Sequence, residues 1–194
     1  MKKLLSLLLA LAVAFAIPAG PGLYVADAAA NGTAISTADD LKAMEKNPSG
    51  NYYLANDIEV PANLMLFTSY DKPFTGTLDG NGHAIKGYTY TSRADWTEQV
   101  ALFGYTKNAT FKNLKMTNVN ISLNQAGTVA PLVAATTGGT FSNISVSGKV
   151  TGKYMRIAAG IVAYSYKDGT FTNCKNSADV TVTKADQGST IAGV

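Results

Sequence analysis

Short apolar segments alternate with polar turns along most of the chain, and one tetrapeptide marks the period of this pattern. Thr-Phe-x-Asn occurs at residues 110–113, 140–143 and 170–173, with a spacing of 30 residues both times. A turn signal precedes each copy, and an apolar residue follows it. Self-similarity at a fixed period of 20–50 residues is typical of repeat architectures. The hydrophobic pattern therefore predicts a chain built from similar, stacked units.

Each unit contains short stretches with the apolar content or the alternation of β-strands. Apolar segments lie nine, nine and ten residues before the tetrapeptides, at 101–104, 131–134 and 160–163. Alternating stretches follow the tetrapeptides, at 116–123, 146–150 and 180–182. Strands this short become stable when successive coils stack about 4.8 Å apart and pair in parallel. The predicted fold class is all-β, a right-handed parallel β-helix with one extra residue in the turn of its third unit.

Equivalent residues in successive coils are expected to lie above one another and to form ladders. Two ladders are predicted, a stack inside the solenoid of Phe111, Phe141 and Phe171 and a hydrogen-bonded amide column along a bend of Asn113, Asn143 and Asn173. Cys174 occupies the position of Leu114 and Ile144, so it is interpreted as a small buried hydrophobe. A reactive thiol is the alternative interpretation.

The chain between residues 51 and 99 has the same ingredients in a less regular order. Strands are predicted at 51–60, 74–78 and 84–91, and loops at 61–73 and 92–99. The sequence Asp-Gly-Asn-Gly at 79–82 is a strong turn signal. If the 30-residue period also held here, Asp79 would lie beside Ala109 in the next coil.

A short helix is predicted ahead of the repeats, within an N-terminal cap segment at residues 31–50. Thr37 can cap the helix, with Asp40 three residues later in a capping-box position. Leu41 and Met44 then share an apolar face, and Pro48 comes just after the helix. Solenoids need covered ends, so the helix is expected to cover the first open end of a β-helix spanning residues 51–194.

Residues 1–30 are predicted to be a secretory signal peptide. Lys2 and Lys3 precede an apolar run at 4–17, and two small-x-small cleavage patterns lie between 26 and 30. The run is shorter than the roughly 20 residues that span a bilayer. The prediction is a secreted or cell-surface bacterial protein without a transmembrane segment beyond the signal peptide; an uncleaved anchor is the alternative.

Composition narrows the possible partners. Of 16 basic and 13 acidic residues, Lys2, Lys3 and Asp27 lie in the predicted signal peptide, which leaves a net charge of +2. Because this charge is small and no basic cluster occurs, no nucleic-acid partner is predicted. A single cysteine excludes a disulfide within the chain.

Several segments resemble one known family. They are residues 38–41, 53–58, 74–85 and 101–104, including the motif Phe-x-Gly-x-Leu-Asp-Gly-Asn-Gly-His at 74–83. In this order they resemble bacterial surface proteins with GLUG repeats, which are right-handed β-helices related in shape to pectin lyases. Similar regions occur ahead of the catalytic part of immunoglobulin A metallopeptidases and in adhesin-like proteins. The second Gly-Leu-x-Gly copy departs from the family pattern, with Pro131 and Ala134 at the glycine positions. The resemblance implies a surface or secreted binding region without an activity of its own.

Residues that could carry chemistry are few. His83, the one histidine, lies near Asp79, which allows acid–base work, but a turn residue is the preferred interpretation. Asp79 and Asn81 alternate with glycines as in some calcium loops, although further acidic ligands are missing. No catalytic residue, metal site or cofactor is predicted, because the acidic residues do not recur in register.

Aromatic residues provide the predicted ligand face. Tyr88 and Tyr90 alternate with threonines and so share one face of a strand, and Trp96 lies in the loop that follows. Exposed rings of this kind can stack on sugars or peptides, so glycans or host surface proteins are the expected partners. The alternative is that both tyrosines cover an edge of the core, with their hydroxyls in water.

The predicted function is a non-catalytic module for adhesion, for glycan or protein binding, or for spacing within a larger surface protein. One alternative is a polysaccharide lyase or glycoside hydrolase on a pectin-lyase-like scaffold; another is an ice-binding solenoid, suggested by the aligned Thr110, Thr140 and Thr170. Residues 190–194 repeat the onset of 158–161, so a truncated last coil and continuation into further repeats or domains are expected.

Overall fold

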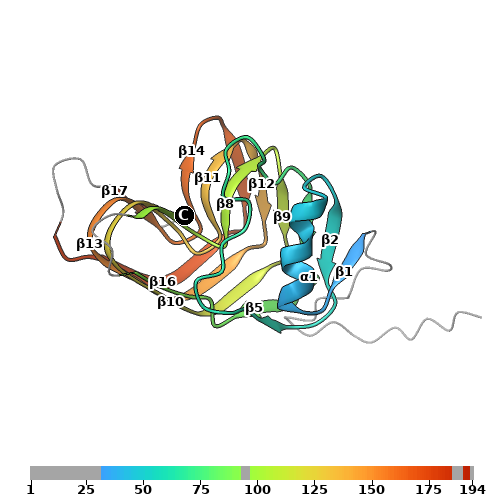
Figure 1. Cartoon of the computed structure of the whole chain (residues 1–194), viewed down its shortest axis with the longest axis horizontal. Helices are drawn as coiled ribbons and strands as arrows, with labels where there is room; N and C mark the ends of the chain where they lie inside the picture. Colours follow the sequence, from blue (N-terminus) through green and yellow to red (C-terminus); the bar gives the residue numbers. More distant parts are fainter. Residues whose placement is uncertain (1–31, 93–96, 185–189, 193–194) are drawn as a thin grey trace, which may run out of the picture.

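The structure is a computed structural model that describes residues 32–92, 97–184 and 190–192. The predicted parallel β-helix is confirmed, since strands wind through about four turns and pair in parallel. They form three sheets around a shared interior, with the single α-helix of this part at one end (Figure 1). The predicted signal peptide at 1–30 lies outside the described residues.

Sheet A holds the Thr-Phe-x-Asn segments. Its strands are, in spatial order, β1 (Thr33–Ile35), β2 (Asn51–Leu54), β4 (Thr77–Asp79), β9 (Thr110–Lys112), β12 (Gly139–Ser142) and β15 (Gly169–Thr172). Sheet C holds the apolar segments that precede them, in β8 (Phe103–Lys107), β11 (Val133–Thr137) and β14 (Val162–Ser165). The coils that hold β9, β12 and β15 therefore pass through sheet C and then sheet A.

Sheet B is the largest sheet and curves along one side of the molecule (Figure 1). Its main path is β3 (Ile58–Glu59), β5 (Ala84–Lys86), β10 (Lys115–Val129), β13 (Ser145–Ala159) and β16 (Lys175–Val182). The strands β6 (Thr89–Ser92) and β7 (Thr97–Val100) also pair with β10, and β17 (Thr190–Ala192) pairs with β13. Ala158 lies opposite Ile191, which is the alignment that the similarity of the two segments predicts.

The 30-residue register is confirmed in sheet A, where Phe141 lies between Phe111 and Phe171. Elsewhere the offset, which is the difference in residue number between two paired residues of successive coils, changes and is then restored. Along β10 and β13 it falls from 30 to 29 at a bulge between Met116 and Val119. The offset is still 29 where Thr136 pairs with Ser165, and the predicted extra residue returns it to 30 by Gly169.

Both predicted ladders are present. The rings of Phe111 and Phe141 stack with centroids 5.4 Å apart, and those of Phe141 and Phe171 with centroids 4.9 Å apart. The amide column runs through Asn113, Asn143 and Asn173, with hydrogen bonds of 2.9 and 2.7 Å. Phe111 and Phe141 are fully buried, whereas Phe171 is 39% exposed because no described coil covers its outer side. Cys174, beside it, is only half-buried for the same reason.

Several predicted strands have different bounds in the structure. The segment 84–91 is two strands, because Gly87 adopts a left-handed conformation (φ +67°) and bends the chain between β5 and β6. Part of the predicted loop 92–99 is β7. The long strands β10 and β13 extend through polar stretches such as 124–128, because the neighbouring coils supply hydrogen-bond partners that local sequence does not reveal.

The first coils do not follow the 30-residue period. Asp79 lies beside Lys112, an offset of 33, so the expected neighbour Ala109 is wrong. The strand predicted at 51–60 divides into β2 and β3. The strand predicted at 74–78 begins with an isolated bridge at Phe74 and continues as β4. The turns between these strands differ in length from those of the later coils, which changes the offset.

The predicted capping helix is confirmed as α1 (Ala38–Ala43), followed by a 3-10 turn, η1 (Met44–Lys46). Thr37 and Asp40 form the capping box, since the Asp40 N–H donates to Thr37 Oγ1 at 3.1 Å and the Thr37 N–H to Asp40 Oδ2 at 2.9 Å. Leu41 and Met44 are fully buried in the core. In the described part of the chain, no helix has the length and apolarity needed to cross a membrane.

Candidate ligand-binding site

The predicted ligand face does not lie open to solvent as expected. Tyr88 and Tyr90 do share a face, but it is the inner one: Tyr88 is fully buried and Tyr90 packs, partly buried, against the core. The bend at Gly87 directs Tyr88 inward, so this ring is not available for stacking on a ligand. Trp96 lies outside the described residues. The alternative interpretation, that the tyrosines cover the core, describes the positions of Tyr88 and Tyr90 better.

The alternative interpretation placed the tyrosine hydroxyls in water, and the hydroxyl of Tyr88 does not lie there. It is buried without a hydrogen-bond partner among the described residues, rather than in contact with bulk water. Burial, and to a smaller extent Tyr90, raises the pKa of Tyr88 well above its ordinary value. The phenol therefore stays neutral at physiological pH, and Tyr88 acts as a core residue.

Asp79 serves the predicted turn and the amide column. Its Oδ1 accepts hydrogen bonds from the Asn81 N–H (2.8 Å) and the Asn113 amide (3.1 Å), and its Oδ2 pairs with Lys112 at 3.0 Å. Asn81 has φ +50°, a conformation that asparagine tolerates better than most residues. Both carboxylate oxygens thus have protein donors, an arrangement that favours the turn over a calcium loop.

His83 lies beside Asp57 and not beside Asp79. Its Nδ1 is 3.5 Å from Asp57 Oδ1, which also accepts a hydrogen bond from the Ala84 N–H at 2.9 Å. The other oxygen of Asp57 pairs with Lys86 Nζ at 2.6 Å. The Asp57 carboxylate therefore connects the turn that follows β2 with strand β5 of the next coil.

The stability of the protein is expected to depend on Asp57 in a pH-dependent way. Hydrogen bonds from Lys86 and then from the Ala84 N–H hold the pKa of Asp57 below its ordinary value of 3.8. A carboxyl with a lowered folded-state pKa stabilises the fold above its unfolded pKa and loses this contribution as the pH falls through the folded pKa. The urea midpoint of Asp57→Asn should therefore lie below that of the wild type at pH 6, and the difference should shrink at pH 3. Asp168→Asn, which removes an exposed carboxylate, should show no such change; equal deficits of Asp57→Asn at both pH values would contradict the prediction.

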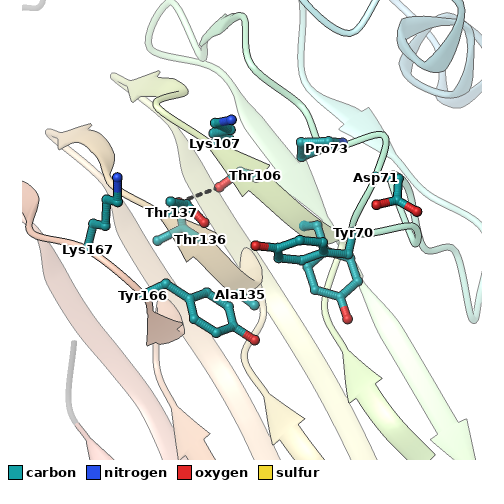
Figure 2. Close-up of a pocket in the computed structure, with 11 residues that line it drawn as sticks. Tyr70, Asp71, Pro73, Thr106, Lys107, Ala135, Thr136, Thr137, Tyr166 and Lys167 are labelled. Carbon is teal, nitrogen blue, oxygen red and sulfur yellow. Dashed lines mark hydrogen bonds between the residues drawn. The ribbon is translucent and has the colours of Figure 1, made fainter.

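One concavity of the described residues lies at the ends of the sheet C strands. It has a volume of about 430 Å³, within the range typical of small-molecule sites. Its aromatic lining comes from Tyr70, Tyr105 and Tyr166. We call this feature the tyrosine hollow, and its other lining residues are Asp71, Pro73, Thr106, Lys107, Ala135, Thr136, Thr137 and Lys167 (Figure 2).

The three tyrosines come from separate segments. Tyr105 is in β8, Tyr166 follows β14 in the turn that carries the extra residue, and Tyr70 belongs to the loop between β3 and β4. Backbone hydrogen bonds place all three segments, because the Phe74 N–H donates to the Tyr105 carbonyl (3.0 Å) and the Tyr166 N–H to the Thr136 carbonyl (2.8 Å). The hollow is thus anchored to the coil-to-coil pairing.

The rings meet at steep angles. Tyr70 lies 5.6 Å from Tyr105 at 88° and 6.1 Å from Tyr166 at 74°, measured between ring centroids and planes. Tyr164 extends the cluster, 4.7 Å from Tyr166 at 82°. Edge-to-face contacts of this kind are favourable between aromatic rings. Tyr70 is 60% and Tyr166 55% exposed, so both rings offer surface to a ligand.

The polar groups of the hollow are arranged around a threonine floor. Thr106 Oγ1 donates to Thr136 Oγ1 at 2.7 Å (Figure 2). Thr136 Oγ1 in turn donates to the Gly138 carbonyl. Partial burial, together with Tyr105, Tyr164, Tyr70 and Glu98 nearby, raises the pKa of Tyr166, so its hydroxyl stays neutral and can donate to a ligand. Lys167 and Asp71 lie on opposite sides of this floor in Figure 2, and Lys107 lies between them near Thr106.

Sequence reasoning missed the tyrosine hollow because its residues do not recur with the repeat. The positions equivalent to Tyr105 hold Ala135 and then Tyr164. Tyr70 lies in a region predicted only as a loop. The one available signal was the extra residue in the third turn, because insertions in a regular solenoid are loops placed on one face.

The fold and the hollow together define a parallel β-helix with an aromatic surface site. Among the described residues, no group of three or more His, Cys, Asp or Glu side chains is placed to hold a metal ion. Residues 23–148 match the family model described as the M26 IgA1-specific metallo-endopeptidase N-terminal region. The match covers more than half of the chain, so the chain belongs to this family, and the resemblance drawn from residues 74–83 and the other quoted segments is confirmed.

One curated relative is halomucin of Haloquadratum walsbyi. It is 29% identical over 135 residues, which cover 61% of this chain and 1% of halomucin. The chain therefore spans only a very small part of that relative. No solved structure matches.

Proposed function

We propose that this chain is a non-catalytic module of a secreted or cell-surface protein, and that it binds a ligand in the tyrosine hollow. The observation that carries the proposal is the convergence of Tyr70, Tyr105 and Tyr166 around a cavity of about 430 Å³. Aromatic rings with a solvent-exposed edge and nearby hydroxyl groups can bind sugars and peptides, which present both apolar and polar surface.

The β-helix supports this role as a rigid scaffold. Successive coils pair through sheets A, B and C, so Thr106 and Thr136 of the hollow sit on strands, and the loop of Tyr70 and the turn of Tyr166 are attached to these strands. Sites built on such elements hold their geometry better than sites on loops. A solenoid also separates the segments before and after it by a fixed rise of about 4.8 Å per coil, which suits a spacer in a larger surface protein.

Two other activities are less well supported. A lyase or glycosidase needs convergent carboxylates, and Asp71 is the only carboxylate among the residues that line the hollow. An ice-binding face needs flat threonine rows in regular array. Thr77 does extend the row of Thr110, Thr140 and Thr170, but the adjacent row on the same strands holds Asp79, Lys112, Ser142 and Thr172, which differ in size and charge.

Binding can be tested with the purified full chain on surfaces that carry neutral and acidic polysaccharides or host glycoproteins. Tyr70→Ala and Tyr166→Ala should each weaken retention about tenfold, because truncating a central aromatic contact costs roughly 1–2 kcal/mol. Tyr154→Ala, outside the hollow, serves as the matched control, and thermal melts check folding.

Two outcomes would contradict the proposal. If Tyr90→Ala lost retention while Tyr70→Ala and Tyr166→Ala kept it, the binding site would be the strand face predicted from the sequence and not the tyrosine hollow. Turnover of a polysaccharide that Asp79→Asn or His83→Ala abolishes would instead support an enzyme.

A further inference from the structure

We infer that the ligand of the tyrosine hollow is an acidic glycan, whose sugar rings contact Tyr70 and Tyr166 while its negative groups pair with Lys107 and Lys167. The inference rests on the proposed function and adds the chemical class of the ligand. Three features support it, namely the charges around the hollow, their spacing and the form of the aromatic walls.

The two lysines of the hollow are distinguished by their place at its rim, since other exposed lysines such as Lys149 also have no acidic partner among the described residues. Within the described ranges neither forms an ion pair, whereas three other lysines have a carboxylate within 3.0 Å, namely Lys42, Lys86 and Lys112. Both are exposed at the rim of the concavity. An unpaired ammonium group keeps its full attraction for an anionic ligand, and a rim of such groups raises the local concentration of anions.

The spacing of the lysines suits a polymer with more than one charge. Lys107 pairs in register with Thr137, and Lys167 follows in the next coil, where the Tyr166 N–H bonds to Thr136. The two backbones are thus two coils apart, roughly 10 Å by strand spacing. An extended chain with repeated carboxylate or sulfate groups can pair with both lysines at once.

The aromatic walls favour sugar rings between these charges. Because Tyr70 and Tyr166 stand at 74° to each other, they form two sides of a recess and not one flat platform. The puckered ring of a sugar presents apolar C–H groups to such walls and hydroxyl groups to the polar floor. Asp71 lies on the Tyr70 side, away from Lys167 in Figure 2, so it can accept from sugar hydroxyls without facing the anionic groups.

The test compares hyaluronan with its carboxyl-reduced form, which has the same backbone without the charge. Wild-type protein should bind hyaluronan at least about tenfold more tightly, and the preference should decrease with added salt, since exposed charges are screened. The double variant Lys107→Met/Lys167→Met should lose the preference. Lys149→Met, an exposed lysine of β13 outside the hollow, should keep it.

The possible outcomes separate this inference from the proposed function. Equal binding of both polymers, weakened by Tyr166→Ala, overturns the acidic ligand class and leaves the binding role intact. Binding of poly-glutamate as tight as that of hyaluronan, or no retention of hyaluronan at low salt, overturns the glycan assignment. Binding that neither Tyr70→Ala nor Tyr166→Ala weakens overturns the inference and the proposed site together.

Discussion

Replacement of Phe141 by alanine is expected to lower the free energy of unfolding by about 3–5 kcal/mol, the range typical of buried phenylalanine. Phe141 is fully buried, and its ring stacks on Phe111 on one side and on Phe171 on the other. The main chain around it is held by coils above and below, so the site cannot collapse to fill the cavity. Urea unfolding followed by circular dichroism measures the change.

Phe171→Ala is the matched control, because it removes the same side chain from the same ladder. Its ring is 39% exposed and stacks on one neighbour only among the described residues. The expected loss is well below that of Phe141→Ala. Equal losses for the two variants would contradict the prediction, because they would show that the contribution of a ladder ring does not depend on its burial by a further coil.

Replacement of Asn143 by alanine is expected to cost about 2–4 kcal/mol. The Asn143 amide donates to Asn113 Oδ1, and its own oxygen accepts from Asn173, so alanine removes two hydrogen bonds of roughly 1 kcal/mol each. The residue also has φ +54°, a left-handed conformation that costs alanine roughly 1–2 kcal/mol. Urea midpoints of the two proteins measure the sum.

Asn143→Gly separates the two contributions. Glycine adopts positive φ without strain, so this variant loses the amide bonds alone and should cost about half as much as alanine. The same experiment on Asn118, which also has positive φ but lies at the bulge in β10, provides a comparison without the ladder. Glycine as costly as alanine at position 143 would mean that backbone conformation contributes little there.

The repeated part of the fold was predictable because each coil carries the same sequence motif at the same position. Thr-Phe-x-Asn recurs every 30 residues, and the Phe and Asn ladders follow directly from pairing identical segments in parallel. The capping helix was equally predictable, because Thr37 and Asp40 form the hydrogen bonds of the capping box within four residues of sequence. Information of this kind is contained within a few residues or one period.

The first coils were less predictable, since their turns differ in length. Asp79 was expected beside Ala109 and instead pairs with Lys112, because the offset there is 33 and not 30. The inward position of Tyr88 depended on a bend at Gly87, which the alternation of Tyr and Thr does not reveal.

By itself, the sequence determined that this chain is a parallel β-helix with stacked phenylalanines and asparagines, since a repeated pattern can bury its apolar residues only by stacking. Only the tertiary structure decided the site. Tyr70, Tyr105 and Tyr166 come from a loop, a strand and an enlarged turn, and no period relates them. The winding of the solenoid brings these segments to one edge of sheet C, where coil-to-coil hydrogen bonds hold them together. Such convergence depends on the lengths of every turn between the segments, which local patterns do not specify.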